Sequence, residues 1–246
     1  MKTNLKPQEY YYLYSTIRAD PLEMILYALK GLCINGELEL FSKYVFIDKS
    51  GKKRSRAFLR LNSKITRREK SSAEDFILSL FNQGEELRMY ELKLRIEEKL
   101  NKNLKEFKDL YVYSDVKEKG FCTWKYFLTL GGRAERKICA NLIDDTERQA
   151  KLQKQDFLKL KQMLSDLGSN AVFLDDEAQK KAGIYKPEFG ELELLFGIGQ
   201  DNLPPKGGEY IGGMYGGGGF SSGSGGGGFS GFGGGDFGGG GAGGSW

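Results

Sequence analysis

Residues 71–121 read SSAEDFILSLFNQGEELRMYELKLRIEEKLNKNLKEFKDLYVYSDVKEKGF, and this stretch decides the fold. Ser71 is a good N-cap residue, and the carboxylate of Glu74 follows in the first turn, where it favours the helix dipole. Apolar residues then recur at helical spacing as far as Phe81. We expect the Asn-Gln-Gly sequence at 82–84 to end this first helix.

The second half of the stretch predicts one long helix and then a β element. The helix is expected over residues 85–108. The run 110–113 is β-prone, because aromatic and β-branched side chains favour strands, and Gly120 marks a turn. Two helices closed by a β-ribbon have the outline of a winged-helix domain. The apolar face of the second helix consists of Leu87, Tyr90, Leu94, Leu100, Leu104 and Phe107.

A weaker version of the same pattern lies at the start of the chain. Pro7 stands at a helix start, where its missing N–H costs nothing, and Asp20 is expected to cap a second helix. Alternating polar and apolar residues then predict a strand over 37–41. Two further strand-like runs, 44–48 and 57–61, flank a basic turn. We therefore predict helix, helix and β-hairpin, a structural echo of the unit that follows.

The residues after the second unit predict mostly helix. The β-prone run 126–130 is expected to end at Gly131-Gly132. A long helix is expected over 133–167, with a break or protrusion in its polar middle at 144–151. Gly168 suits the C′ position that ends such a helix.

The end of the chain differs in composition. After two prolines and a lysine at 204–206, residues 207–246 are mostly glycine interrupted by single aromatic side chains. We expect this tail to be disordered, because glycine loses the most backbone entropy on folding, and to act as a flexible tether or in weak self-association. The predicted fold class is mainly α (α+β), with tandem winged-helix-like units, short β-hairpins, a long C-terminal helix and a disordered glycine-rich tail. The predicted domains are the two winged-helix-like units at 1–65 and 66–130, the long helix and short elements at 131–203, including an ordered apolar segment at 189–196, and the tail at 204–246.

Composition argues against several classes of enzyme. The chain has no histidine, which excludes Ser-His-Asp triads and histidine metal ligands. Its three cysteines, Cys33, Cys122 and Cys139, are far apart, so we expect neither a zinc ribbon nor a dithiol centre. The acidic cluster that begins at Asp175 fits a helix cap better than a metal site. We therefore predict no catalytic residue, no metal and no cofactor.

The strongest local signal is a run of cations around the predicted turn at 49–54, although the formal net charge of the chain is only +4. Three interpretations remain open. The run could contact nucleic-acid phosphates, attract anionic lipid headgroups or another acidic partner, or belong to a solvated hairpin whose lysines prevent edge-to-edge pairing. The run also contains Lys64 and Lys70, and its candidate residues for binding an anionic partner are Lys49, Lys52, Lys53, Arg54, Arg56, Arg60, Arg67 and Arg68.

Two further features bear on nucleic-acid binding. The predicted helix over 85–108 is rich in glutamate, and its mixed charge argues against a recognition helix in a DNA groove. The tyrosines at 10, 11, 12 and 14 could stack on bases. Four neighbours on a helix cannot all face one way, so we expect some in the core and some exposed, and we favour core packing plus an interface over base stacking.

Leu5, Pro7 and Glu9 open the first unit with a leucine-proline-glutamate phrase, and residues 229–246 close the chain with a glycine–aromatic phrase. The other matching positions are Ile25, Leu29, Gly36, Leu38, Leu40, Glu74, Ile77, Leu78 and Leu80. Together these phrases resemble a group of uncharacterised bacterial membrane proteins with paired winged-helix-like cytoplasmic units and a glycine-rich tail, which is similar to the tail of TPM-domain proteins. The resemblance brings no known catalytic residues. This sequence departs from the group because it has no apolar run of the roughly 20 residues that span a bilayer.

The function predicted from these features is that of a non-enzymatic adaptor that binds another protein. The first residues of the chain lack the apolar run that a signal peptide contains. We therefore expect a cytoplasmic protein that can lie at the membrane surface. The alternative prediction is a nucleic-acid-binding protein that uses the basic hairpin and the flexible tail.

Overall fold

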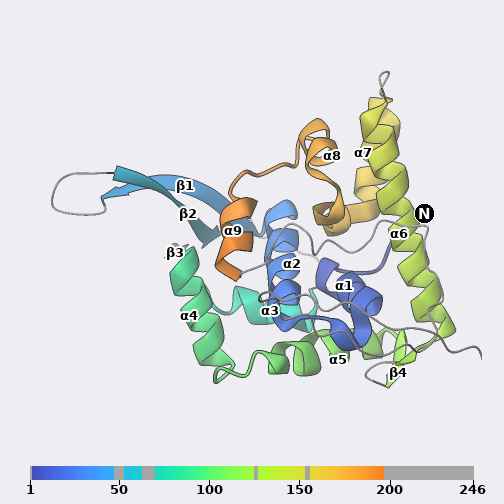
Figure 1. The fold of residues 1–246 in the computed structure, drawn as a ribbon, viewed down its shortest axis with the longest axis horizontal. Coiled ribbons are helices and arrows are strands. Elements are labelled where there is room, and N and C mark those ends of the chain that lie inside the picture. Colours follow the sequence, from blue (N-terminus) through green and yellow to red (C-terminus); the bar gives the residue numbers. More distant parts are fainter. Residues whose placement is uncertain (1, 47–52, 63–69, 125–126, 153–155, 197–246) are drawn as a thin grey trace, which may run out of the picture. The chain divides into compact units, whose positions relative to one another are not determined.

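The computed structural model describes residues 2–46, 53–62, 70–124, 127–152 and 156–196, which all belong to one compact unit, Met1–Glu209. This part of the chain is mainly helical and carries two small antiparallel sheets (Figure 1), which confirms the predicted α+β class. The predicted tail at 204–246 lies outside the described residues. The domain boundaries stay predictions.

The core is built around two N-terminal helices, α1 (Pro7–Ser15) and α2 (Pro21–Ile34), which are joined by the short 3₁₀ turn η1 (Thr16–Arg18). Asp20 caps α2 as predicted, because its carboxylate accepts the N–H of Leu22 at 2.7 Å. Residues 23–33 are all buried, as expected for a helix that is enclosed on every side. Tyr10, Tyr11 and Tyr12 are also buried, so the prediction of core packing for them is confirmed.

The main sheet has three antiparallel strands in the order β1 (Leu38–Phe46), β2 (Lys53–Leu61) and β3 (Glu86–Arg88). The separate strands predicted at 37–41 and 44–48 are one continuous strand, which pairs with β2 along its whole length. Strand β3 lies where helix was predicted. Leu87 pairs with Leu59 of β2, so tertiary pairing overrides the helical pattern of the local sequence.

The stretch 71–121 keeps its predicted first helix but not the rest of its outline. Helix α3 (Ser72–Leu78) begins with a capping box of Ser71 and Glu74. The single helix predicted over 85–108 is wrong, because α4 (Met89–Lys99) ends where Asn101 and Lys102 adopt φ values of 48° and 61°.

The strand predicted at 110–113 is also wrong. The chain there is helical, through the π-helical turn η2 (Phe107–Val112) and then α5 (Tyr113–Glu118). Phe107, Val112 and Val116 are each 0% exposed. Burial of this helical face outweighs the β propensity of the run.

The C-terminal part of the unit corrects the predicted helix over 133–167. Helix α6 (Leu130–Lys151) starts earlier, with Thr129 as its N-cap, so Gly131 and Gly132 lie in its first turn and do not end a strand. A second helix, α7 (Phe157–Leu167), follows a break at Leu152 and ends at Gly168, whose φ of 59° confirms the predicted C′ residue. The remaining elements are hairpin strands β4 (Cys122–Trp124) and β5 (Phe127–Leu128), the 3₁₀ helix η3 (Gly168–Phe173), α8 (Asp176–Lys181), which Asp175 caps as predicted, and α9 (Phe189–Phe196).

Candidate interaction surface

Three cations of the basic run, Lys53, Arg54 and Arg56, lie on the outer half of the β1–β2 hairpin, which extends away from the helices in Figure 1. We call residues 42–46 of β1 and 53–56 of β2 the arm. The inner half of the hairpin buries Leu38, Leu40 and Leu59 in the core, whereas the arm side chains are exposed or half-buried. Hydrophobic burial therefore fixes the base of the hairpin and leaves the arm free to meet a partner.

The two faces of the arm differ in chemistry. Side chains alternate along a strand, and the register pairs Tyr44 with Ser55 and Phe46 with Lys53. One face therefore presents Tyr44 and Phe46, which are 77% and 68% exposed. The ammonium group of Lys53 lies 4.9 Å from the centre of the Phe46 ring. The opposite face presents Arg54 and Arg56 across from Val45 and Lys43.

Acidic neighbours neutralise some of the predicted cations but not others. Arg60 forms ion pairs with Glu39 at 2.9 Å and with Glu86 at 3.4 Å, and Glu86 also pairs with Lys43. The hydrogen bond to Glu39 holds the pKa of the Arg60 guanidinium above its ordinary value. Arg60 therefore serves the sheet and is not available as a free cation.

Arg54 and Arg56 are exposed and, among the described residues, have no carboxylate within ion-pair distance. With Lys53 they form the cationic part of the arm. Lys70 lies apart from the arm, on the polar pocket described below. Lys49, Lys52, Lys64, Arg67 and Arg68 lie outside the described residues.

The arm also carries an open strand edge. Asn62 donates its N–H to the carbonyl of Glu37 next to β1, whereas Ala57 donates its N–H away from β1, to Glu191 of α9 at 3.0 Å. Because successive N–H groups point to opposite sides of a strand, those of Ser55 and Lys53 also point away from β1. Strand β3 pairs only with residues 58–60. Within the described ranges, the backbone of Ser55 and Lys53 is therefore an open edge.

No family model, curated protein or solved structure matches this chain. Its function is therefore inferred from its own surfaces. In the part that the structure describes, no helix combines the length and apolar character needed to cross a bilayer.

The helical part of the unit carries a polar pocket of about 570 Å³. Several of its charged groups stabilise the fold. Lys119 pairs with the buried carboxylate of Glu9 at 2.6 Å, Lys6 lies 3.4 Å from Glu74, and Asp115 accepts the first two N–H groups of α3. Among the described residues, no cluster of three or more cysteine or carboxylate groups is arranged to hold a metal ion.

The sequence identified the cations of the arm but missed its aromatic and backbone features. Tyr44 and Phe46 lie in the run 44–48, which was predicted only as a strand beside the basic turn. The signal that could have found them is the gathering of aromatic and β-branched residues at 44–46 directly before a basic turn, because it predicts that the strand continues to the turn. The open edge depends on where β3 stops, and the local sequence does not encode that position.

Proposed function

We propose that this chain is a non-enzymatic adaptor whose arm binds an acidic, extended segment of another protein as an added strand. The observation that carries the proposal is the open edge at Lys53 and Ser55. An added strand gains affinity from main-chain hydrogen bonds and specificity from the side chains that flank it. The guanidinium groups of Arg54 and Arg56, which have no ion pair among the described residues, favour a partner with carboxylates, and exposed Tyr44 supplies apolar contact.

A second candidate function has its own support. Exposed aromatic rings beside free cations are the elements with which proteins bind single-stranded nucleic acid, by stacking on bases and contacting phosphates. Tyr44 and Phe46 could stack, while Lys53, Arg54 and Arg56 could meet the backbone. This mode needs the side chains of the arm and makes no use of the open edge, so the two candidates can be separated by substitution.

Proline at position 55 distinguishes the two functions. Ser55→Pro removes an N–H group that β1 does not use, and edge strands tolerate proline. We expect Ser55→Pro to weaken binding of a fluorescent peptide of alternating glutamate and valine by about tenfold, the effect of one or two lost main-chain hydrogen bonds. Binding of a single-stranded RNA oligonucleotide should not change. Both affinities are measured by fluorescence anisotropy at low salt.

Two controls complete this experiment. Ser55→Ala keeps the N–H and should bind the peptide like the natural chain. The double change Arg54→Glu and Arg56→Glu should weaken peptide and RNA alike, since both are anionic. Adaptor function by strand addition is excluded if Ser55→Pro and Ser55→Ala bind the peptide equally. RNA binding that survives Ser55→Pro, with no peptide binding by any variant, supports the second candidate.

We also propose that the chain contains two winged-helix-like units. The larger unit consists of α3, β3, α4, residues 107–118 and the β4–β5 hairpin. A simpler unit precedes it and consists of α1, α2 and the β1–β2 hairpin. The order helix, strand, helix, helix, hairpin supports the first assignment, and helix, helix, hairpin supports the second. Many winged-helix units bind proteins, in keeping with the adaptor function. We further propose that residues 204–246 act as a tether or in self-association. The proposed location is cytoplasmic, and the chain is proposed to be related to the membrane-protein group.

A further inference from the structure

A second exposed surface lies far along the chain from the arm, at the β4–β5 hairpin and the start of α6. Trp124, Phe127 and Leu130 are 74%, 65% and 84% exposed, and we call these three side chains the apolar tip. Trp124 and Phe127 are cross-strand partners. Large exposed apolar side chains that gather at one place indicate an interaction site.

The backbone around the apolar tip is held firmly in place. Thr129 donates its N–H to the carbonyl of Phe121 at 3.0 Å and its hydroxyl to the carbonyl of Gly120 at 2.9 Å. The Thr129 hydroxyl oxygen also accepts the N–H of Gly132 and so caps α6. These bonds join the hairpin to the helix, so the exposure of the tip is a property of the folded unit.

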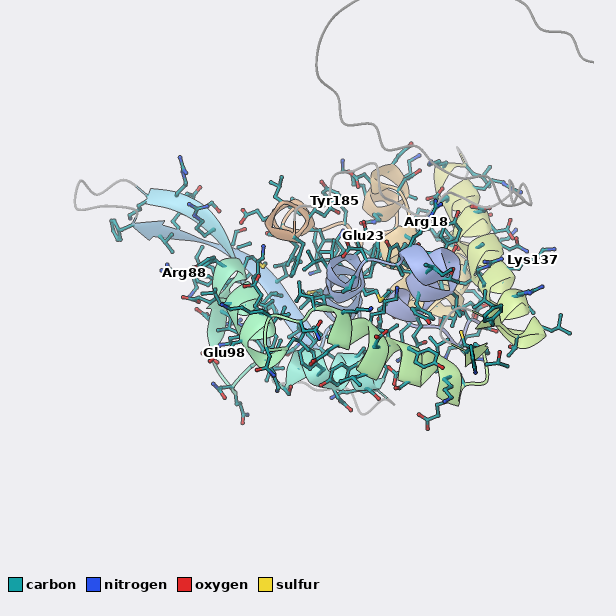
Figure 2. All side chains as sticks on the ribbon, turned by 60° about the horizontal axis from the view of Figure 1, so that its bottom comes forward. Arg18, Glu23, Arg88, Glu98, Lys137 and Tyr185 are labelled. Carbon is teal, nitrogen blue, oxygen red and sulfur yellow. The ribbon has the colours of Figure 1, made fainter. Side chains whose placement is uncertain are left out.

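The charge beside the apolar tip is positive. Residues 119–134 contain no acidic residue, and Arg133 and Lys137 are exposed on α6. Figure 2 shows Lys137 directed away from the neighbouring helices. The nearby Glu135 faces inward, where its carboxylate accepts the hydroxyl of Thr3 at 3.1 Å. Lys137 follows Leu130 by about two turns, or about 10 Å along the helix axis.

The two charged residues of α6 between Arg133 and Lys137 are held by the N-terminal part of the chain. Glu135 also accepts the N–H of Asn4 at 2.7 Å, and Arg136 donates to the carbonyl of Leu13 at 3.3 Å. Glu118, the acidic residue that precedes the tip in sequence, is exposed and lines the polar pocket. A partner that meets the tip therefore meets cations and no exposed carboxylate of α6 up to Lys137.

We infer that the apolar tip and its two cations bind an anionic lipid surface. The tip exposes on the order of 450 Å² of apolar area. Tryptophan prefers the headgroup level of a bilayer, and cations near the surface are attracted by anionic lipids. The inference is independent of the function proposed for the arm.

The test measures co-sedimentation of the full chain with vesicles of equimolar phosphatidylcholine and phosphatidylserine. The paired change Trp124→Ser and Phe127→Ser should lower the partition coefficient by about 100-fold, because two aromatic anchors are lost. The paired change Arg133→Gln and Lys137→Gln should lower it by about 30-fold. The cation variant should bind vesicles of phosphatidylcholine alone no differently from the natural chain.

A matched control removes apolar area elsewhere. Phe157 and Leu158 are 72% and 82% exposed at the start of α7, and their paired replacement by serine should leave lipid binding unchanged. The double change Arg54→Glu and Arg56→Glu in the arm should also leave most of the lipid binding intact. All variants alter exposed side chains, so their thermal unfolding should match that of the natural chain. The inference is overturned if the Phe157 and Leu158 variant loses as much binding as the tip variant, since that result indicates general adhesion.

Fluorescence reports insertion of the tip directly. The chain has two tryptophans, so Trp246→Phe leaves Trp124 as the only one. Its emission should shift to shorter wavelength on addition of the mixed vesicles and should be quenched by lipids that carry bromine on their acyl chains. Unchanged emission at saturating vesicle concentration contradicts the inference.

Discussion

Replacing Lys119 with methionine is expected to lower the free energy of unfolding by about 3 kcal/mol, because it leaves the Glu9 carboxylate buried without its ion-pair partner. Glu9 is 0% exposed, and Lys119 donates to its two oxygens at 2.8 and 2.6 Å. This loss of stability is at the lower end of the range for removing one partner of a buried ion pair, since the Lys119 side chain is 31% exposed and water can take its place. Denaturation in urea measures the loss.

The double change Glu9→Gln and Lys119→Met tests the origin of this effect. It removes both charges, so it should recover much of the stability that Lys119→Met loses. Lys70 supplies a matched control, because it lines the same pocket and has no ion pair among the described residues. Lys70→Met should change stability by no more than about 0.5 kcal/mol. Equal losses for Lys70→Met and Lys119→Met are incompatible with a specific role for the Glu9 pair.

The dependence on pH follows from the same carboxyl group. Burial raises the pKa of Glu9, and Lys119 opposes this shift. A folded-state pKa above the unfolded value means that Glu9 contributes stability fully below the unfolded pKa and loses it as the pH rises through the folded pKa. Without Lys119 the pKa should rise further. The stability that Lys119→Met loses should therefore be largest near neutral pH. It should shrink as the pH falls toward 4.5, the ordinary pKa of a glutamate side chain.

The sequence predicted those parts of the fold that depend on local chemistry. The N-caps at Asp20, Ser71 and Asp175 are visible because a capping side chain acts on backbone groups two or three residues away. The strand β3 was not predictable in this way. It exists because Leu87 meets Leu59, a residue far from it in the chain, and its own sequence favours helix.

The candidate surfaces show the same division between local and distant determinants. The cations of the arm were visible in the sequence, but the neutralisation of Arg60 depends on the strand register that places Glu39 opposite it, and Glu86 on β3 adds a second ion pair. The apolar tip was missed because Gly131-Gly132 was interpreted as the end of a strand. Glycine has poor helix propensity, and the reason for Gly132 is a close approach to another part of the chain.

Gly132→Ala is expected to destabilise the unit by about 2–3 kcal/mol, although alanine is the better helix former. A Cβ at this position would lie 2.2 Å from the carbonyl oxygen of Phe121 and 3.0 Å from its carbonyl carbon. These are backbone atoms, and they cannot move away without breaking the bonds that Thr129 makes to the hairpin. Gly131 provides the matched control.

A Cβ on Gly131 would meet only the Thr129 hydroxyl, at 3.6 Å. Gly131→Ala should therefore keep or raise stability, by at most about 1 kcal/mol from helix propensity. Urea denaturation and amide hydrogen exchange at Thr129 compare the two variants. If the close packing of α6 on Phe121 orients the apolar tip, Gly132→Ala should also weaken vesicle binding, whereas Gly131→Ala should not. Equal stability of the two alanine variants would show that the hairpin moves freely against α6, and the tip could not then be a preformed surface.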